Sequence, residues 1–237
     1  MTACLLTMGQ VLADRLYKRA ATIAFRRIAV SSHQEFVRLG SRYGGWWVPR
    51  SVLAPGGVAY CAGAGEDVTF DLALLEHGLF VTTFDPTPRS IDYVTSLGID
   101  DQHFRFLPVG WWSDETQIDL FAPRDRAHVS YSALDLQGTG QSITVPVRRV
   151  SSLARELGNP TVDLIKMDIE GAEMTVIPDL LANGPLPRVL CVEFDKVRPL
   201  REVTSLIRRL RSAGLMPVRS EERNVTFVRD LSAQGAA

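Results

Sequence analysis

Residues 58–68 read Val-Ala-Tyr-Cys-Ala-Gly-Ala-Gly-Glu-Asp-Val, a short apolar run followed by a glycine turn. The run Val58–Cys61 predicts a β-strand, the turn Gly63-Ala64-Gly65 ends it, and residues 67–77 predict a helix. A strand, a turn and a helix N-terminus in this order present backbone N–H groups that suit a nucleotide or a carboxylate. In an open α/β sheet, such a pocket lies at the carboxyl ends of the strands.

On the C-terminal side the alternation of strands and helices continues, which is typical of a parallel sheet with helices on both faces. Further strands are predicted at residues 79–84, 104–109, 162–167 and 188–193. Thr87 and Pro88 predict a helix start, whereas Pro178 is expected to kink or end the helix that begins near Glu170. Short strands near 118–123, 128–132 and 142–147 predict an antiparallel insertion, and strands at 216–219 and 224–228 predict a terminal hairpin.

The whole chain of 237 residues has an ordinary globular composition and a formal net charge of −1. This balance provides no overall basic field for a nucleic-acid backbone, so no nucleic-acid partner is expected. The cysteines Cys4, Cys61 and Cys191 lack disulfide or metal-site spacing, which predicts reduced thiols and no metal centre. No apolar stretch is long enough to span a bilayer and no signal peptide is indicated, so a cytoplasmic location is expected.

Residues 1–50 differ in charge from the rest of the chain: eight basic and two acidic residues give a net of +6, which leaves −7 for residues 51–237. Apolar residues recur there at roughly helical intervals, at Leu5, Leu12, Leu16, Ile23 and Ile28. We therefore expect a helical N-terminal arm or lid over 1–50 and one α/β domain over 51–237, with inserted strands at about 113–148. The arm is expected to pack on its own domain or on a second subunit, and peripheral contact with a membrane surface is the alternative.

The residues after the first turn restrict the ligand. A dinucleotide fingerprint requires a third small residue, but Glu66 and Asp67 stand where a pyrophosphate would bind. Two unit charges about 4 Å apart interact by roughly 4 kcal/mol at an effective dielectric constant of about 20, so these acids would repel a diphosphate. S-adenosylmethionine has a sulfonium and an ammonium group but no phosphate, and it suits this charge. As an alternative, both acids merely stabilise a helix N-terminus.

Asp85 follows the second predicted strand, 22 residues after Gly63. A carboxylate at about this spacing accepts hydrogen bonds from ribose hydroxyls in nucleotide-binding sheets. The pair Asp85-Pro86 is also an ordinary turn former, which is the structural alternative. The combination of turn, spacing and acid favours a nucleotide site.

A second set of acids lies at two later strand ends. Asp168 ends the strand 162–167, Glu170 and Glu173 follow it, and Glu193 and Asp195 end the next strand. These carboxylates are expected to bind the methionine ammonium or to act as a general base, and they leave Mg²⁺ binding open without indicating it. Acids that stabilise a helix N-terminus are the alternative.

With these residues in view, the chain resembles the FkbM-type family of S-adenosylmethionine-dependent methyltransferases from about Tyr43 to Val228. The most specific segment, Asp163-Leu-Ile-Lys-Met-Asp-Ile-Glu-Gly-Ala-Glu173, is similar to the family signature DLLKIDVEGAE. Residues 63–71 and 84–88 are similar to a subgroup that has GxGEDxxFD and FDPTP. More familiar members have an acid, Asn, Gly and Glu at the positions of Cys61, Gly65, Asp67 and Asp85.

The resemblance implies a class I methyltransferase (Rossmann-like) fold, with a seven-stranded, mostly parallel sheet and a terminal antiparallel hairpin. By the same resemblance, the methionine part of the cofactor would be surrounded by Gly63, Gly65, Glu66 and Asp67, with Asp168 beside them. Asp85 and Pro86 would lie at the ribose, and Val109 and Gly110 near adenine. Members of the family commonly methylate hydroxyls of sugars or polyketide natural products, which implies an O-methyltransferase.

For such an enzyme we expect in-line displacement, in which an acceptor oxygen attacks the sulfonium methyl while the protein holds both groups in line. Removing the hydroxyl proton contributes roughly 10²–10⁴-fold in rate. Asp168 is the first candidate for this base, and His128 in the insertion is the second. Candidates for the acceptor side come from three places. They are Trp46 and Trp47 beside the glycines 44–45, His128 and Tyr131 in the inserted segment that is placed to cover the substrate mouth, and the strand-end acids Glu193 and Asp195.

Two other functions stay open from the sequence. A non-catalytic module would keep the fold and use the basic arm to bind a partner, which the altered first turn and Cys61 favour. A nicotinamide-dependent oxidoreductase is disfavoured by the missing third glycine. The acceptor is expected to be a sugar, a glycolipid or a natural product, and the sequence leaves a homo-oligomer open.

Overall fold

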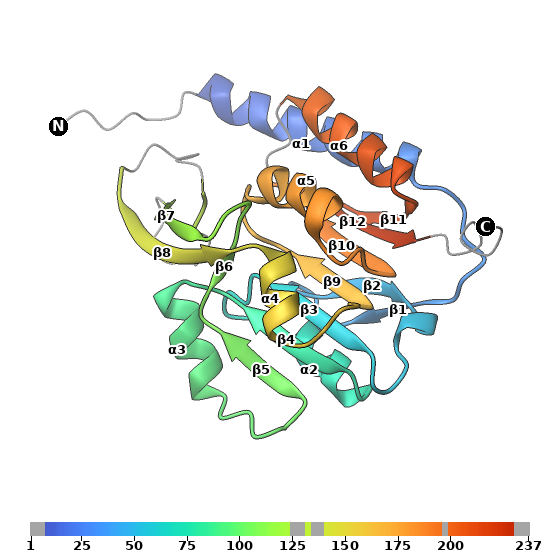
Figure 1. Ribbon diagram of the computed structural model, residues 1–237. Coiled ribbons are helices and arrows are strands. Elements are labelled where there is room, and N and C mark those ends of the chain that lie inside the picture. The colour runs from blue at the N-terminus through green and yellow to red at the C-terminus, as the bar shows by residue number, and fades with distance from the viewer. Residues whose placement is uncertain (1–7, 124–130, 134–139, 196–198, 230–237) are drawn as a thin grey trace.

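The computed structural model describes residues 8–123, 131–133, 140–195 and 199–229 (Figure 1). Its main sheet has seven strands in the order β11-β12-β10-β9-β3-β4-β5. The strands are β3 (Val58–Ala62), β4 (Phe80–Phe84), β5 (Phe104–Leu107), β9 (Leu164–Met167), β10 (Val189–Glu193), β11 (Leu215–Glu221) and β12 (Asn224–Arg229). All neighbours are parallel except β12, which runs antiparallel to both β10 and β11. This arrangement confirms the predicted class I methyltransferase fold and its terminal hairpin.

The strand order reverses beside β3, and this reversal positions the functional site. The chain passes from β3 outward to β4 and β5 and then returns to the other side of β3 as β9. In the register, Ala62 is level with Phe84 on one side and with Met167 on the other. The three turns that follow these residues therefore lie next to one another, and the carboxyl ends of strands at such a reversal are where open α/β sheets bind ligands.

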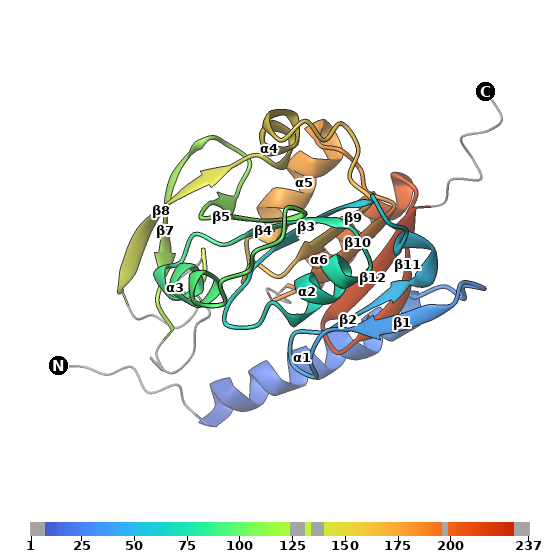
Figure 2. The same ribbon diagram turned by 90° about the horizontal axis from the view of Figure 1, so that it is seen from below.

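Helices cover both faces of the sheet, as the alternation in the sequence predicts (Figure 2). One face is covered by α1 (Met8–Ile28), α4 (Val150–Glu156), α5 (Glu173–Asn183) and α6 (Leu200–Ser212), and the other by α2 (Thr69–Glu76) and α3 (Pro88–Ser96). Alternate strand residues supply the two cores, because successive side chains of a strand point to opposite faces. Tyr60 and Ile165 are fully buried on the first face, and Cys61 and Leu164 on the second.

Residues 36–49 differ from the predicted helical arm over 1–50. They form a hairpin of β1 (Phe36–Leu39) and β2 (Trp46–Pro49) that contacts β10 and β12. The hydroxyl of Thr226 donates to the carbonyl of Trp47 at 2.8 Å, and Trp46 is only 2% exposed. The short 3₁₀ helix Arg50–Val52 connects this hairpin to the domain. The hairpin thus covers sheet surface that would otherwise be open.

The predicted insertion forms a small second sheet of β6 (Gly110–Trp111), β7 (Thr116–Phe121) and β8 (Ser142–Arg148). β7 and β8 are antiparallel as expected, whereas β6 pairs in parallel with β8 and is too short for a sequence pattern to show. Of the third predicted strand, residues 128–130 lie outside the described residues, and Ser132 forms a bridge to Phe121.

Pro178 does not end its helix, because α5 continues to Asn183, and a kink at this residue stays a prediction. A proline inside a helix removes one hydrogen bond and costs about 3 kcal/mol. Val176, Ile177 and Leu180 are at most 1% exposed, and their burial on the sheet offsets this cost.

The packing of α1 on the domain depends on Phe25, which is fully buried with its ring centroid 5.5 Å from that of Phe194. We expect Phe25→Ala to lower the free energy of unfolding by about 3 kcal/mol or more, because it leaves a cavity in the core. Ile23→Ala, at a position 45% exposed on the same helix, should cost less than about 1 kcal/mol. Urea unfolding monitored by circular dichroism measures both, and equal costs would show that α1 does not pack on the domain in solution.

Candidate functional site

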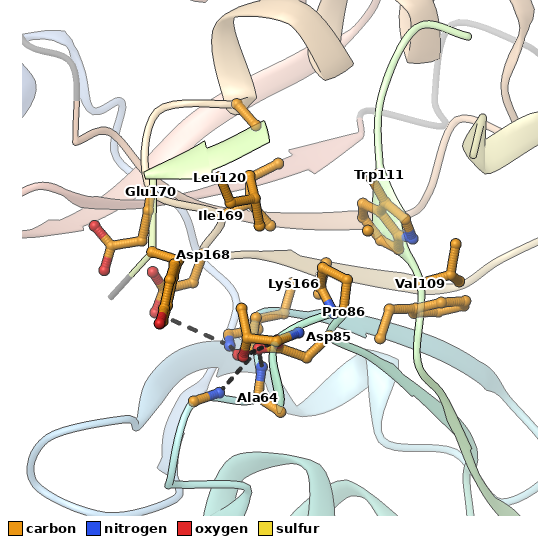
Figure 3. Close-up of a pocket in the computed structure, with 18 of the residues that line it drawn as sticks. Ala64, Asp85, Pro86, Val109, Trp111, Leu120, Lys166, Asp168, Ile169 and Glu170 are labelled. Carbon is orange, nitrogen blue, oxygen red and sulfur yellow. Dashed lines mark hydrogen bonds and ion pairs between the residues drawn. The ribbon is translucent and has the colours of Figure 1, made fainter. Parts of the chain in front are cut away.

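A pocket opens where the turns after β3, β4 and β9 meet (Figure 3). Its walls come from these turns, from the segment that enters β6 and from the small sheet. The lining residues include Gly63–Asp67, Asp85–Thr87, Val109–Trp111, Asp168–Glu170, Lys166, Ile118, Leu120, Tyr131, Val147 and Tyr43. Figure 3 shows Asp168 and Glu170 on one side of the pocket, and Trp111 and Val109 on the other. The pocket therefore has an acidic side and an apolar side.

The floor of the pocket is set by a close contact between the turns after β3 and β9. Gly63 has φ of +85°, and a Cβ at this residue would lie 1.7 Å from the carbonyl oxygen of Asp168. Only glycine permits both the backbone conformation and the approach. Lys166, which is 4% exposed, donates from Nζ to the Gly63 carbonyl and lies 4.0 Å from an oxygen of Asp168. Lys166 thus joins the two turns from below.

Buried charges beneath the floor are balanced around Lys166. Burial lowers the pKa of Lys166, but the carboxylates of Asp168 and Asp71 outweigh burial, so the pKa is raised on balance. Burial raises the pKa of Asp71, and Lys166 opposes this shift. The hydroxyl of Thr83 donates to Asp71 at 2.5 Å. Removing either charged partner would leave the other buried without compensation, which is costly.

Both carboxylate oxygens of Asp85 accept hydrogen bonds from the protein, one from the glycine turn and the other from Thr87. One oxygen accepts the N–H groups of Ala64 and Gly65 at 2.9 and 3.1 Å. The other accepts the N–H and the hydroxyl of Thr87 at 2.9 and 2.7 Å. A carboxylate has about four acceptor positions, so none is left for a ribose hydroxyl unless one of these bonds is exchanged. Asp85 lines the pocket beside Pro86, and its direct contacts hold the adjacent turns, so its place at the ribose stays a prediction.

Glu66 and Asp67 line the pocket as predicted, but each carboxylate already has protein partners. Glu66 forms an ion pair with Arg89, with contacts of 2.8 and 2.9 Å to the two oxygens. Asp67 accepts the hydroxyl of Ser41 at 2.5 Å and the N–H and hydroxyl of Thr69. Burial raises the pKa of Asp67, and these hydrogen bonds outweigh it, so the pKa is lowered. Their contact with the methionine part of the cofactor stays a prediction.

The negative charge that faces the pocket comes from the family signature instead. Asp168 and Glu170 line the pocket, and Glu170 has φ of +51°, which is uncommon for a residue other than glycine. The fully buried Glu173 accepts the N–H of Gly171 at 2.8 Å and so holds this turn. The hydroxyl of Ser132 donates to the Glu170 carbonyl at 2.6 Å, which ties the insertion to the turn.

Glu193 and Asp195 are not among the residues that line the pocket, and their contact with an acceptor stays a prediction. Both form ion pairs with Arg223 from the turn between β11 and β12, and the Glu193 contact is 2.5 Å. Carboxylate oxygens of Asp168, Glu170 and Asp195 lie within 4.8 Å of one another. Such oxygens suit Mg²⁺ or Ca²⁺, but an acidic cluster alone does not make a metal site.

Of the aromatic residues predicted to face the acceptor, some line the pocket and others lie elsewhere. Trp46 is buried under the β1–β2 hairpin, and the Arg219 guanidinium lies 3.7 Å from the ring centroid of Trp47, so neither tryptophan reaches the pocket. Tyr43, which is 85% exposed, and Tyr131 do line the pocket. His128 lies outside the described residues.

Trp111 forms the apolar side of the pocket together with Val109. Its side chain is 2% exposed, and its ring centroid is 5.1 Å from that of Phe84. Its buried Nε1–H has no hydrogen-bond partner within the described residues. A buried donor without a partner costs about 1–3 kcal/mol, so a ligand acceptor at this wall would gain affinity. No sequence signal separates Trp111 from Trp46, because Gly45-Trp46-Trp47 and Gly110-Trp111-Trp112 have the same local pattern.

Comparisons with known proteins give a family match and several more distant likenesses. Residues 59–214 match the model of a family described as the methyltransferase FkbM domain. Human probable methyltransferase-like protein 24 is 26% identical over 137 residues, which span 57% of this chain but only 31% of that protein. Magnesium protoporphyrin IX methyltransferase from Synechocystis PCC 6803 with bound SAM has 12% identity and a TM-score of 0.42 over 97% of this chain and 87% of its own. Methanococcus jannaschii fibrillarin has 11% identity and a TM-score of 0.42, over 83% and 81%.

The acidic cluster predicts a pH dependence of stability. Burial, with Asp168 and Asp195 adding to it and Arg223 opposing it, raises the pKa of Glu193 from 4.5 to about 9. Between these values the folded state keeps a proton that the unfolded state releases, so the protonated Glu193 stabilises the fold. This contribution to the free energy of unfolding is complete below pH 4.5 and is lost as pH rises to about 9. We expect Glu193→Gln to flatten the fall in urea midpoint across this range. An unchanged slope would show that Glu193 is ionised in the folded protein.

Proposed function

This chain belongs to the FkbM family of S-adenosylmethionine-dependent methyltransferases, and we propose that it transfers the methyl group to a hydroxyl of a sugar, glycolipid or natural-product acceptor. The observation that carries the proposal is the meeting of the Gly63 turn with Asp168 and Glu170 in one pocket. The turn provides a place for the cofactor, and the carboxylates lie where an acceptor hydroxyl would need them.

The residues of the pocket fit S-adenosylmethionine. The turn at Gly63–Gly65 permits close approach of a ligand to the backbone, as an amino-acid carboxylate requires. Asp168 and Glu170 suit the ammonium and sulfonium charges. The unpartnered Nε1–H of Trp111, beside Val109 and Pro86, suits a flat heterocycle with acceptor nitrogens. A diphosphate is disfavoured, because the described lining has no arginine and its lysine, Lys166, already contacts the Gly63 carbonyl and the Asp168 carboxylate.

When bound, S-adenosylmethionine supplies a methyl group on a sulfonium centre that is ready for transfer. The chain then has to orient the acceptor, take up its proton and exclude water. Asp168 is our candidate to take up the proton, since its carboxylate lines the pocket and lies 4.0 Å from Nζ of Lys166, which helps to hold it in place. Ile118 and Leu120 of the small sheet line the same pocket and limit the entry of water.

The composition of the walls supports an acceptor with both polar and apolar parts. Carboxylates of Asp168 and Glu170 accept hydrogen bonds from hydroxyls, as sugar recognition requires. Ile118, Leu120 and Tyr131 add an apolar surface from the insertion. This combination is what a glycolipid or a polyketide with hydroxyl groups would need.

A non-catalytic binding module is the second candidate, favoured by the protein partners that already occupy Glu66, Asp67 and Asp85. It would show little or no affinity for the cofactor. The nicotinamide alternative is not proposed again, since the family match and the antiparallel β12 both oppose it.

Calorimetry with S-adenosylmethionine distinguishes these candidates. We expect saturable binding to the native protein and at least about tenfold weaker binding to Asp85→Ala, because the glycine turn loses two hydrogen bonds and Thr87 loses two more. Asp100→Asn, an exposed site beyond α3, serves as the control and should bind like the native protein. A native protein that binds no cofactor would favour the non-catalytic module.

The role of Asp168 is tested by methyl transfer to a panel of sugars and hydroxylated lipids, followed by mass spectrometry. Asp168→Asn should lower kcat roughly 10²–10⁴-fold, because it cannot take up the hydroxyl proton. Full activity in this variant, with cofactor affinity unchanged, would remove Asp168 from the base role.

A further inference from the structure

One side of the molecule concentrates basic residues on two helices. α1 contains five basic residues and one acidic residue, and α6 contains four and one, although the whole chain has a net charge of −1. Both helices pack against β11, and Figure 1 shows them along the same side of the molecule. Together they form the basic face, which we define by the exposed residues Leu16, Arg19, Ile23, Arg27, Arg201 and Arg208.

The outward side of α1 mixes arginines with large apolar residues. Leu16 and Ile23 are 59% and 45% exposed, and Arg19 and Arg27 lie on the same side at helical spacing. The opposite side contains Ala21, which like Phe25 is fully buried against the domain. The apolar residues of the outward side are therefore not needed for packing α1.

The side chains of α6 also divide into a buried apolar side and an exposed basic side. Val203, Leu206, Ile207 and Leu210 are buried on the sheet, whereas Arg201 and Arg208 are exposed. Helix stability explains only part of this charge, because basic residues stabilise a helix mainly in its last turn. Arg19, Arg201 and Arg208 lie outside the last turn of either helix. Within the described residues, no carboxylate forms an ion pair with these three arginines.

From these observations we propose that the basic face binds an anionic lipid surface. Charge complementarity selects an anionic partner, since each basic residue near such a surface contributes about fivefold to partitioning. The exposed Leu16 and Ile23 favour lipid over nucleic acid, because they can enter the region between headgroups and acyl chains. Among the described helices none is long and apolar enough to cross a bilayer, so the contact is peripheral. This inference goes beyond the proposed methyl transfer and does not depend on it.

Vesicle co-sedimentation of the full chain tests the proposal, with phosphatidylcholine vesicles that contain or lack phosphatidylserine. The native protein should bind the anionic vesicles and lose binding as salt is raised. Arg19→Gln/Arg208→Gln should lower the partition coefficient roughly 30-fold, about fivefold for each arginine. The control Arg105→Gln/Arg155→Gln removes the same charge from exposed positions on β5 and α4 and should retain most of the binding.

A second variant separates lipid insertion from attraction by charge alone. Leu16→Ser/Ile23→Ser keeps every charge, and it should bind the same vesicles roughly tenfold or more weakly. Circular dichroism verifies that each variant is folded. The proposal is overturned if native protein ignores phosphatidylserine, or if the control loses as much binding as Arg19→Gln/Arg208→Gln.

The basic face could instead bind a second copy of this chain or a nucleic acid, and each of these outcomes is measured separately. Either result would also overturn the proposal. Light scattering would show a dimer that Leu16→Ser/Ile23→Ser dissociates, if the face joins two copies of this chain. Fluorescence anisotropy would show tight binding to single-stranded RNA without vesicle binding, if the partner is a nucleic acid. Cofactor calorimetry on the same samples keeps a failure here distinct from a failure of the proposed methyl transfer.

Discussion

The site depends on one close contact, between the turn after β3 and the turn after β9. At Gly63 there is no room for a side chain, since a Cβ would lie 1.7 Å from the Asp168 carbonyl oxygen. Lys166 holds the same two turns through the Gly63 carbonyl and the Asp168 carboxylate. Because the contact is fixed by backbone and by a buried cation, Asp168 faces the pocket from an ordered position. Such preorganisation is what positional catalysis requires.

The distribution of charge around the pocket is more selective than a count of acids suggests. Glu66 is paired with Arg89, and Glu193 with Arg223, while Asp67 and Asp85 bind hydroxyl and backbone N–H donors. The first pair is about 40–45% exposed on each side, so it contributes little to stability and can exchange with solvent or ligand. Asp168 and Glu170 also line the pocket, with Lys166 4.0 Å from the carboxylate of Asp168. A phosphate-free, positively charged cofactor is compatible with this arrangement.

Sequence patterns located the strands of the sheet closely, because apolar runs bounded by glycine and proline reflect local backbone preferences. They also identified the signature 163–173, in which Lys166 and Asp168 share one side of a strand and its extension. They missed the β1–β2 hairpin and misplaced Trp46 and Trp47, since tryptophans beside glycines look alike whether they face a ligand or a sheet. Arg89 and Arg223 were missed for another reason: each pairs with an acid more than 20 residues away, at a distance that no local pattern encodes.

The amino-acid sequence by itself determined the α/β class, the positions of the main strands along the chain and the family signature, because these depend on periodicity, turn residues and short-range spacing. The tertiary structure alone decided which acids remain available to a ligand, which tryptophan lines the pocket and which residues of α1 point outward. Those properties depend on partners brought together by the crossover from β5 back to β9 and by the covering hairpin. A side chain's function is set by what it contacts, and contacts between distant segments exist only once the chain has folded.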